Sequence, residues 1–488
     1  MDIYVEPFLL FCSVLLLVSL FASKAGTRFG VPILLLFLGV GMLFGSSGFG
    51  FRFENYDMSQ AIGTAALCII LFSGGLDTKY EDIKPIAAQG VVLATVGVLL
   101  TAIFTGIFIY YAVYLWFPSF SISFLEAMLL AAVMSSTDSA SVFAILRGKG
   151  VNLKNNLKPM LELESGSNDP MAYMLTVVLI QLITAGQGDT ISYGPAVISF
   201  FVQFAVGIGA GYFLGKAAVW LINKINLEND SFYPILLITC GIFIFSATYI
   251  AKGNGFLAVY LAGLVIGNSK FAHKRLSLRV FDGLTWLSQI ILFLALGLLV
   301  SPYRLLPVAL VSLLIGAFMI FGARPLTVFI SLLPFRKTPV RDKIFISWVG
   351  LKGAVPILFA IFPLTAAIES SQFIFNVVFF ITLMSLLLQG TSLTRVAQWL
   401  HLSNEHEKIE FKDFNVEFDD DIMHVMTEIE ITDSWLKKGK LLKNLPIPKR
   451  TIVLLIKRDG KYLAPKDNIA LTENDKLMVI TTDADGLL

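Results

Sequence analysis

The chain is organised as a series of long apolar runs separated by short polar segments. Most of these runs have the length of about 18–25 residues that an α-helix needs to cross a membrane. The pattern predicts an all-α, polytopic membrane domain over residues 1–400, with thirteen transmembrane helices, plus or minus one. The predicted spans are 5–22, 31–47, 59–76, 88–116, 123–146, 158–185, 194–223, 233–250, 254–268, 279–300, 305–332, 343–364 and 372–399.

Basic residues are distributed unevenly between the two sets of connecting loops. One set of alternate loops carries eighteen Lys or Arg residues, and the other carries only Arg52, Lys252 and Arg304. Loops rich in Lys and Arg are retained in the cytoplasm, so the richer set is predicted to face the cytoplasm. The protein is then predicted to lie in the inner (plasma) membrane of the cell. The N-terminus is then outside, and an odd number of spans places the C-terminal segment in the cytoplasm.

Composition changes near residue 404. The chain is 56% hydrophobic and carries 37 Lys or Arg against 35 Asp or Glu. Of these, 13 basic and 17 acidic residues lie in 405–488. This shift predicts a boundary between the membrane domain and a small cytoplasmic α/β domain over 405–488. The net charge of +2 gives no indication of nucleic-acid binding, and the three cysteines all lie inside apolar spans without the spacing of a metal site.

Four ionisable residues lie where charge is least favourable. Asp138 is in the fifth span, Glu164 and Asp169 are in the sixth, and Lys352 is in the twelfth. An ionisable side chain at membrane depth costs at least a few kcal/mol and usually marks a functional site. A satisfied interhelical ion pair is the alternative interpretation.

The fifth and twelfth spans are interrupted by residues that disfavour a continuous helix. Five small polar residues occupy 135–139, and Gly350, Gly353 and Pro356 surround Lys352. Glycine raises the entropic cost of a helix and proline removes a hydrogen-bond donor. Two interrupted spans in separate halves of a chain are typical of the substrate site of a secondary transporter. Simple kinks without a ligand remain the alternative.

Glu164, Ser165, Asn168 and Asp169 form a polar stripe on the sixth span at helical spacing. A cation that leaves water needs several oxygen ligands. The carboxylates of Asp138 and Asp169, the Ser165 hydroxyl and a freed Thr137 carbonyl are predicted to provide them, with Asn168 bracing the two broken helices.

A proton on either aspartate removes the charge that attracts the cation. Cation and proton therefore compete for Asp138 and Asp169, and competition at one alternately exposed site is sufficient for antiport. Glu164 and Lys352 are interpreted as a structural ion pair, although spacing alone leaves open which carboxylate Lys352 faces.

These motifs resemble the NhaP-type branch of the monovalent cation:proton antiporters. The resemblance covers about residues 1–400 and rests on Thr137-Asp138, Glu164-Ser165, Asn168-Asp169 and GLKGAVP at 350–356. It implies that Asp138 and Asp169 bind an alkali cation with Thr137 and Ser165. It also implies that Asn168 holds the unwound region and that Glu164 pairs with the basic residue of the twelfth span.

The same resemblance implies an inverted-repeat fold, a homodimer, and a core that moves against a dimerisation domain. An Asn-Asp pair such as Asn168-Asp169 is associated with electroneutral exchange in this family. The sequence departs from the family pattern at Ser73, where many relatives carry Glu, and at Lys352, where many carry Arg. Both departures put strict Na⁺ selectivity in doubt.

The segment 405–488 predicts two strands at 423–432 and 476–482, a short helix at 434–445, and a hairpin over 451–465 with Asp459-Gly460 at its turn. This order is similar to the C-terminal domain of TrkA, of the type that regulates potassium conductance. The resemblance implies a dimerising domain and a small regulatory ligand at 405–488, often a nucleotide, and favours K⁺ over Na⁺. A dimerisation or stability module without a ligand is the alternative.

Taken together, these patterns predict a K⁺(Na⁺)/H⁺ antiporter without a resident cofactor. A cation channel gated by the cytoplasmic segment is the main alternative, but the chain has no TVGYG-like filter. A membrane enzyme is disfavoured because all four histidines lie outside the spans, namely His273, His401, His406 and His424.

Overall fold

The computed structural model describes two compact units, Met1–Asn404 and Glu405–Leu488. The residues it describes are 5–29, 32–46, 48–51, 55–148, 151–185, 193–404, 426–431, 441–442, 451–458, 461–465, 469–473 and 475–481.

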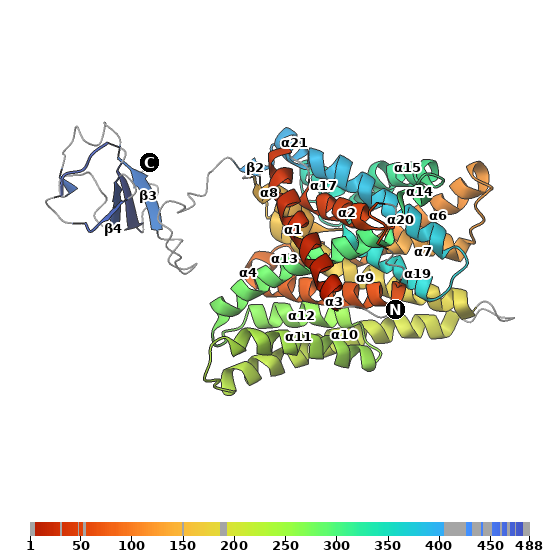
Figure 1. The fold of residues 1–488 in the computed structure, drawn as a ribbon, viewed down its shortest axis with the longest axis horizontal. Helices are drawn as coiled ribbons and strands as arrows, with labels where there is room; N and C mark the ends of the chain where they lie inside the picture. The colour runs from red at the N-terminus through yellow and green to blue at the C-terminus, as the bar shows by residue number, and fades with distance from the viewer. Residues whose placement is uncertain are drawn as a thin grey trace. The chain divides into compact units, whose positions relative to one another are not determined.

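The first unit is almost entirely helical (Figure 1). Its elements are α1 (Val5–Phe29), α2 (Ile33–Phe44), α3 (Tyr56–Asp77), α4 (Tyr80–Ile83), α5 (Ala87–Val92), the π-helical turn η1 (Leu93–Gly97), α6 (Val98–Trp116), α7 (Phe124–Val133), α8 (Ser139–Gly148), β1 (Asn152–Leu153), α9 (Leu157–Ala185), α10 (Tyr193–Lys224), α11 (Phe232–Ile250), α12 (Gly255–Gly267), α13 (Lys274–Leu299), α14 (Pro302–Leu305), α15 (Ala309–Phe318), η2 (Met319–Ala323), α16 (Arg324–Ser331), α17 (Val340–Trp348), α18 (Ala354–Phe359), α19 (Ile361–Thr365), α20 (Ser371–Ser385), η3 (Leu386–Gly390), α21 (Thr391–Trp399) and β2 (Ser403–Asn404).

Helices cover each of the thirteen predicted spans. Within the described residues, eight helices are long and apolar enough to cross a membrane by length and composition. Four further spans contain the shorter apolar helices α2, α7, α12 and α18–α19. The remaining one is α9, which is 29 residues long but carries acidic side chains. The predicted all-α membrane domain with two broken helices is therefore confirmed, the breaks falling between α7 and α8 and between α17 and α18.

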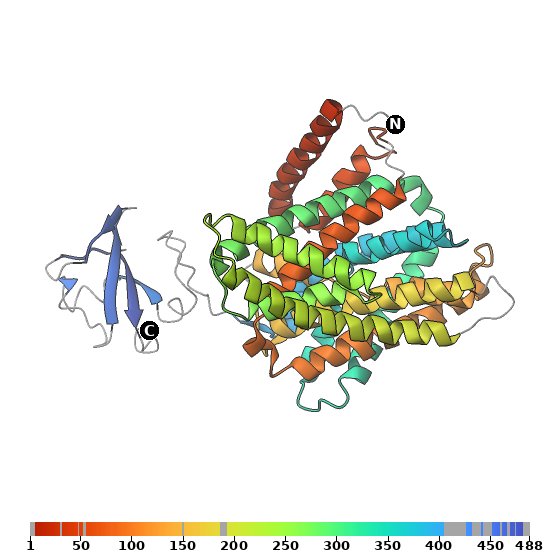
Figure 2. The ribbon, with the colours of Figure 1, turned by 90° about the horizontal axis from the view of Figure 1, so that it is seen from below.

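Glycines allow the helices α2 and α13 to approach each other closely. A Cβ at Gly41 of α2 would collide with the Leu294 carbonyl of α13, and one at Gly297 would collide with the Leu38 carbonyl. Small residues are the usual means of bringing membrane helices together, because lipid gives no hydrophobic force between them. The α2–α13 pair is thereby held at backbone contact, while α1 lies at the edge of the unit (Figure 2).

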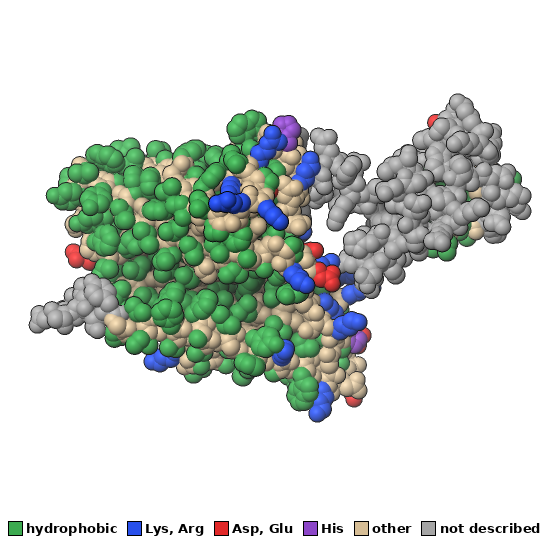
Figure 3. Space-filling view, turned by 180° about the vertical axis from the view of Figure 1, so that it is seen from behind, with side chains coloured by type: hydrophobic (Ala, Val, Ile, Leu, Met, Phe, Trp, Pro, Cys, Tyr) green, Lys and Arg blue, Asp and Glu red, His purple; other side chains and the backbone are tan. Residues whose placement is uncertain are grey.

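The outer surface of this unit matches a protein surrounded by lipid. Large apolar side chains such as Phe21, Phe213, Ile250 and Phe321 are more than half exposed. In the space-filling view apolar side chains cover the broad face, and Lys and Arg gather mainly toward one end (Figure 3). This distribution is typical of a membrane-spanning body with a polar rim.

The described part of the second unit is a four-stranded antiparallel sheet in the order β3-β6-β4-β5. Its strands are β3 (Met426–Glu430), β4 (Thr451–Arg458), β5 (Lys461–Leu463) and β6 (Lys476–Thr481). The predicted strands and the hairpin pairing are confirmed, whereas the Asp459-Gly460 turn and most of the predicted helix 434–445 lie outside the described residues. Ile429, Ile456 and Leu477 form the centre of its apolar core.

A buried carboxylate links two segments of this sheet. The Asp475 side chain is 1% exposed and accepts hydrogen bonds from Arg458 at 2.9 and 2.7 Å and from the Thr472 backbone at 2.8 Å. Burial alone would raise the pKa of this carboxyl, but the hydrogen bonds from Arg458 and Thr472 outweigh it and lower the pKa. The stabilisation is therefore complete above about pH 4, the pKa of an unfolded aspartate, and is lost as pH falls through the lower folded value.

Replacing Asp475 by asparagine is expected to destabilise this unit by about 2 kcal/mol at neutral pH, because hydrogen bonds to a charged group are lost. The loss should shrink at acid pH, where the wild-type carboxylate is also neutral. Hydrogen exchange of the β4 and β6 amides in the full-length protein measures both effects. Glu473→Gln, at an exposed neighbour, is the control, and equal protection in Asp475→Asn and wild type at neutral pH would contradict the prediction.

Candidate functional site

The first break lies between α7 and α8, where Ser135, Ser136 and Thr137 interrupt the helix. Asp138 then caps α8, because its Oδ1 accepts from the Ser141 backbone N–H at 3.0 Å and its Oδ2 accepts from the Ser141 hydroxyl. An acidic N-cap satisfies free N–H groups and favours the positive end of the helix dipole. The run of small polar residues therefore ends one half-helix and starts the next.

The second break crosses the first. The Asp138 backbone N–H donates to the Leu351 carbonyl at 2.8 Å, and Lys352 Nζ donates to the Ser136 carbonyl at 2.8 Å. The Lys352 backbone N–H in turn donates to the Ser385 hydroxyl of α20 at 2.9 Å. A Cβ at Gly353 would collide with the Asp138 carboxylate. The two unwound segments therefore satisfy each other's backbone groups, and only glycine fits at their crossing.

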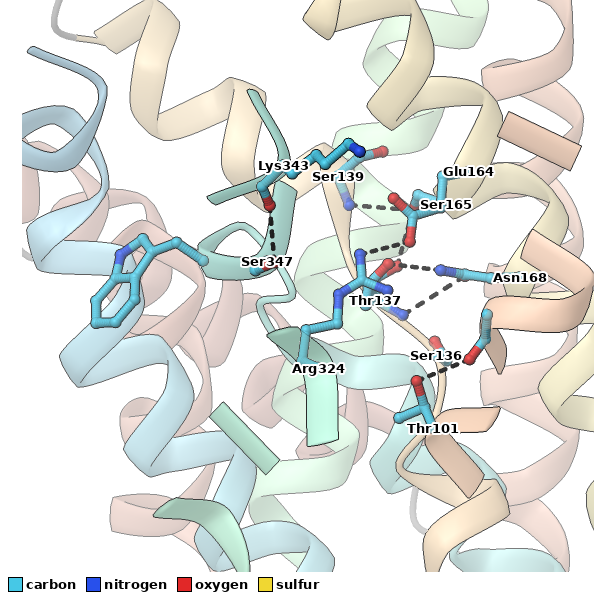
Figure 4. A network of polar contacts seen from close by, with 12 residues as sticks. Thr101, Ser136, Thr137, Ser139, Glu164, Ser165, Asn168, Arg324, Lys343 and Ser347 are labelled. Carbon is cyan, nitrogen blue, oxygen red and sulfur yellow. Dashed lines mark hydrogen bonds and ion pairs between the residues drawn. The ribbon is translucent and has the colours of Figure 1, made fainter. Parts of the chain in front are cut away.

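Three side chains of α9 hold the first break from the other side (Figure 4). The Ser165 hydroxyl donates to the Thr137 carbonyl at 2.8 Å and accepts from the Ser139 N–H at 3.0 Å. Asn168 Nδ2 donates to the Thr137 hydroxyl at 2.5 Å, and the Ser136 hydroxyl donates to Asp169. Asn168 thus braces one break rather than two.

The predicted ion pair between Glu164 and Lys352 is wrong. Glu164 pairs with Arg324 at 2.5 Å, with the two side chains 2% and 7% exposed. Lys352 instead donates to the Ser136 carbonyl, so its ammonium is already engaged at the crossing. Arg324 lies at the start of α16, in the eleventh span, and the sequence signal that could have found it was a lone arginine inside that apolar run.

A cavity of about 330 Å³ reaches the two aspartates. Asp138, Ser165 and Asp169 line it, and so does Ser73 of α3. Among the described residues, the other acidic side chains that line it are Asp77, Glu162 and Asp282, and no Lys or Arg is among its lining residues. Asp138 is half-buried while Asp169 is 6% exposed. A cation in this cavity would therefore meet carboxylates and hydroxyls, the ligands that hard cations prefer.

A second cavity of about 460 Å³ lies nearer the start of α3 and shares no lining residue with the first. Tyr173 lies one helical turn beyond Asp169, and its ring is 5.0 Å from that of Phe256 and 5.8 Å from that of Phe359. All three are nearly fully buried. The second cavity has its own lining, which includes Asp57 and Tyr249. Of these two cavities, only the first is lined by Asp138 and Asp169.

Most of the predicted ligands come together in the fold. Asp138, Ser165 and Asp169 share the cavity, whereas Thr137 is not among its lining residues and its carbonyl accepts the Ser165 hydroxyl. The binding of a cation by these residues stays a prediction. Ser136, whose hydroxyl donates to Asp169, was not predicted as a site residue, although it lies in the same run as Thr137.

Comparisons with known proteins agree on one family. The family described as sodium/hydrogen exchanger, transmembrane, matches residues 13–399. The K(+)/H(+) antiporter NhaP of Alkalimonas amylolytica is 39% identical over 484 residues, covering 98% of this chain and 81% of that protein. The K(+)/H(+) antiporter NhaP2 of Shewanella sp. (strain ANA-3) is 38% identical over 480 residues with the same coverage.

A more distant relative and a solved structure extend the comparison. The Na(+)/H(+) antiporter NhaP of Pseudomonas aeruginosa (strain PAO1) is 28% identical over 378 residues, which are 73% of this chain and 85% of that protein. The sodium proton antiporter MjNhaP1 of Methanocaldococcus jannaschii superimposes with a TM-score of 0.68 at 20% identity, over 80% of this chain and 97% of that one. This last likeness concerns the fold.

Proposed function

Because the chain belongs to the sodium/hydrogen exchanger family, we propose that it exchanges K⁺ or Na⁺ for H⁺ across the membrane, with both ions competing for Asp138 and Asp169. The family is one of transporters. The observation that carries the assignment of the site is the cavity that ends at these two carboxylates, where two broken helices cross.

The separation of the two cavities supports a carrier over a channel. A channel needs a continuous path for its ion, whereas the two cavities share no lining residue, and the buried rings of Tyr173 and Phe256 line only the second one. A carrier exposes its site to one side at a time. Movement of α9 and the crossed helices relative to the surrounding helices would open the site toward the second cavity and close it toward the first.

We favour K⁺ as the cation. Two relatives at 38–39% identity are named K(+)/H(+) antiporters, whereas the relative named for Na⁺ is 28% identical. Ser73 lines the cavity in a position where the sequence pattern of the family often has glutamate, which leaves one charged oxygen fewer. Fewer charged ligands suit the weakly hydrated ion, because selectivity depends on the number and field strength of the ligands.

We propose electroneutral exchange, since one neutral residue, Asn168, stands beside one titratable residue, Asp169. The remaining proposals follow from the resemblance of the sequence. They are a homodimer in the inner membrane with its N-terminus outside, and a cytoplasmic TrkA-like domain at 405–488 that binds a small ligand such as a nucleotide. The four-stranded sheet supports a small folded domain there.

The proposed function is tested in everted membrane vesicles with an acid interior. Adding K⁺ or Na⁺ is expected to collapse the pH gradient, with a lower half-saturating concentration for K⁺. The exchange rate should be the same at a membrane voltage clamped to zero and at an imposed membrane voltage if exchange is electroneutral.

Vesicles lacking the protein are the control. A channel would move the cation without an obligatory proton, so the pH gradient would persist until a protonophore is added, and that outcome would replace antiport by the channel alternative. No response to either cation in vesicles that contain the folded protein would refute cation/proton exchange.

A further inference from the structure

One face of α13 carries a polar stripe that the proposed site does not use. Asp282, Thr285 and Gln289 follow one another at intervals of three and four residues, so they lie on one side of the helix. All three line the cavity of about 330 Å³ that ends at the two aspartates. Polar side chains inside a membrane-spanning helix are unfavourable unless they meet a partner, water or a ligand.

The stripe has a counterpart with the same spacing on α9. Glu162, Ser165 and Asp169 line the same cavity, again at intervals of three and four residues. The helix α13 packs mainly on α2 and α3, whereas α9 packs mainly on α7, η1, α10 and α5. The two stripes therefore belong to different walls, and the cavity lies between them.

The two stripes also reach similar depths. Asp169 lies twelve residues after Leu157, where α9 begins, and Gln289 lies fifteen residues after Lys274, where α13 begins. At a rise of about 1.5 Å per residue, these are depths of about 18 and 22 Å along their helices. Each stripe therefore begins with an acidic residue near the start of its helix, continues with a hydroxyl and ends deeper with a side chain that carries an oxygen. On α9 these are Glu162, Ser165 and Asp169, and on α13 they are Asp282, Thr285 and Gln289.

Two members of the α13 stripe have unused hydrogen-bonding capacity. The Thr285 hydroxyl is buried and has no partner within the described part of the chain. Gln289 is half-buried, and its amide makes no hydrogen bond to another described residue. Buried polar groups in native proteins are normally paired, so a ligand or water that passes through the cavity is the natural partner for these oxygens.

We propose that α13 forms the second wall of the cation pathway. Asp282, which is exposed, attracts the hydrated cation at the mouth. The Thr285 hydroxyl and the Gln289 amide oxygen then replace water molecules as the cation approaches Asp138 and Asp169. This inference rests on the proposed cation exchange and adds three positioning residues to it.

Kinetics of the intact protein in proteoliposomes test this wall. Gln289→Leu keeps the size of the side chain but removes its oxygen, and is expected to raise the KM for K⁺ about tenfold, the effect of losing one hydrogen bond-like contact to a charge, with little change in the maximal rate. Thr285→Val, a nearly isosteric change, should raise it severalfold. Ser288→Ala is the matched control, because Ser288 is a buried neighbour on α13 that does not line the cavity.

Asp282→Asn has a separate signature. It is expected to raise the KM for K⁺ at low ionic strength, and the difference from wild type should disappear as an impermeant salt is added, because exposed charges are screened over about 10 Å at moderate salt.

The outcomes separate the inference from the function beneath it. Wild-type KM values in both Gln289→Leu and Thr285→Val, or a reduced maximal rate and thermal stability with unchanged KM, would overturn the role of α13 while exchange itself stands. If wild-type protein exchanges no cation, the proposed function fails first.

Discussion

Replacing Asp169 by asparagine is expected to reduce cation/proton exchange by roughly a hundredfold or more. A unit charge beside a bound cation contributes several kcal/mol at the dielectric of a protein site, and asparagine can neither carry that charge nor bind the transported proton. The fold should persist, because the Ser136 hydroxyl donates to Asp169 Oδ1 and the amide oxygen of asparagine can accept the same hydrogen bond. Acid-loaded everted vesicles measure the loss.

Asp342→Asn is the matched control for that experiment. Asp342 is also a buried aspartate, at the start of α17, but it accepts hydrogen bonds from Asn155 at 3.2 Å and does not line the cavity. Its replacement should leave exchange near the wild-type rate. Exchange above a tenth of wild type in Asp169→Asn, at equal protein in the membrane, would exclude Asp169 as the essential carrier of charge.

The crossing of the two helix breaks explains why Asp138 and Lys352 lie inside the membrane unit. Asp138 lies at the N-terminus of α8, where unpaired N–H groups create a partial positive charge. Lys352 donates to the Ser136 carbonyl, just past the end of α7, where unpaired carbonyls create a partial negative charge. Each ionised side chain therefore compensates the backbone that the break leaves open, and the Asp138 carboxylate still faces the cavity.

Much of this arrangement could be predicted from the sequence, for identifiable reasons. The breaks were visible because Ser135 to Ser139 and the Gly350–Pro356 segment disfavour a helix inside long apolar runs. The polar side of α9 was visible from its helical spacing. Both signals are local, and local patterns fix helix breaks and faces.

The partners across helices could not be predicted in the same way. Glu164 meets Arg324 because α16 and α9 approach in space, 160 residues apart in the chain. Spacing along the sequence carries no information on such a contact, and two basic residues, Arg324 and Lys352, were available to one carboxylate. For the same reason, the sequence did not predict that Asp282, Thr285 and Gln289 of α13 line the cavity.

Replacing Arg324 by leucine is expected to destabilise the membrane unit by about 3–5 kcal/mol, because the buried Glu164 carboxylate loses its partner. The pair is almost entirely excluded from solvent, with side chains 2% and 7% exposed. Among the described residues the direct ion-pair partner of Glu164 is Arg324, whereas the Lys352 ammonium donates to the Ser136 carbonyl. Thermal unfolding of the detergent-solubilised protein measures the loss, and Arg395→Leu, at an exposed arginine near the end of the membrane unit, is the comparison.

A double-mutant cycle then distinguishes the two possible partners of Glu164. Removing both charges with Glu164→Leu and Arg324→Leu should recover much of the stability that either change costs alone, because no unpaired charge remains buried. The coupling energy between Glu164 and Arg324 is expected to exceed clearly that between Glu164 and Lys352, whose ammonium lies at the crossing of the breaks. A larger coupling with Lys352 would restore the pairing that the sequence suggested and would mean that Arg324 stabilises the fold by some other contact. Lys352→Leu alone should instead impair exchange more than stability, because it uncovers the Ser136 carbonyl next to Asp169 without stranding a carboxylate.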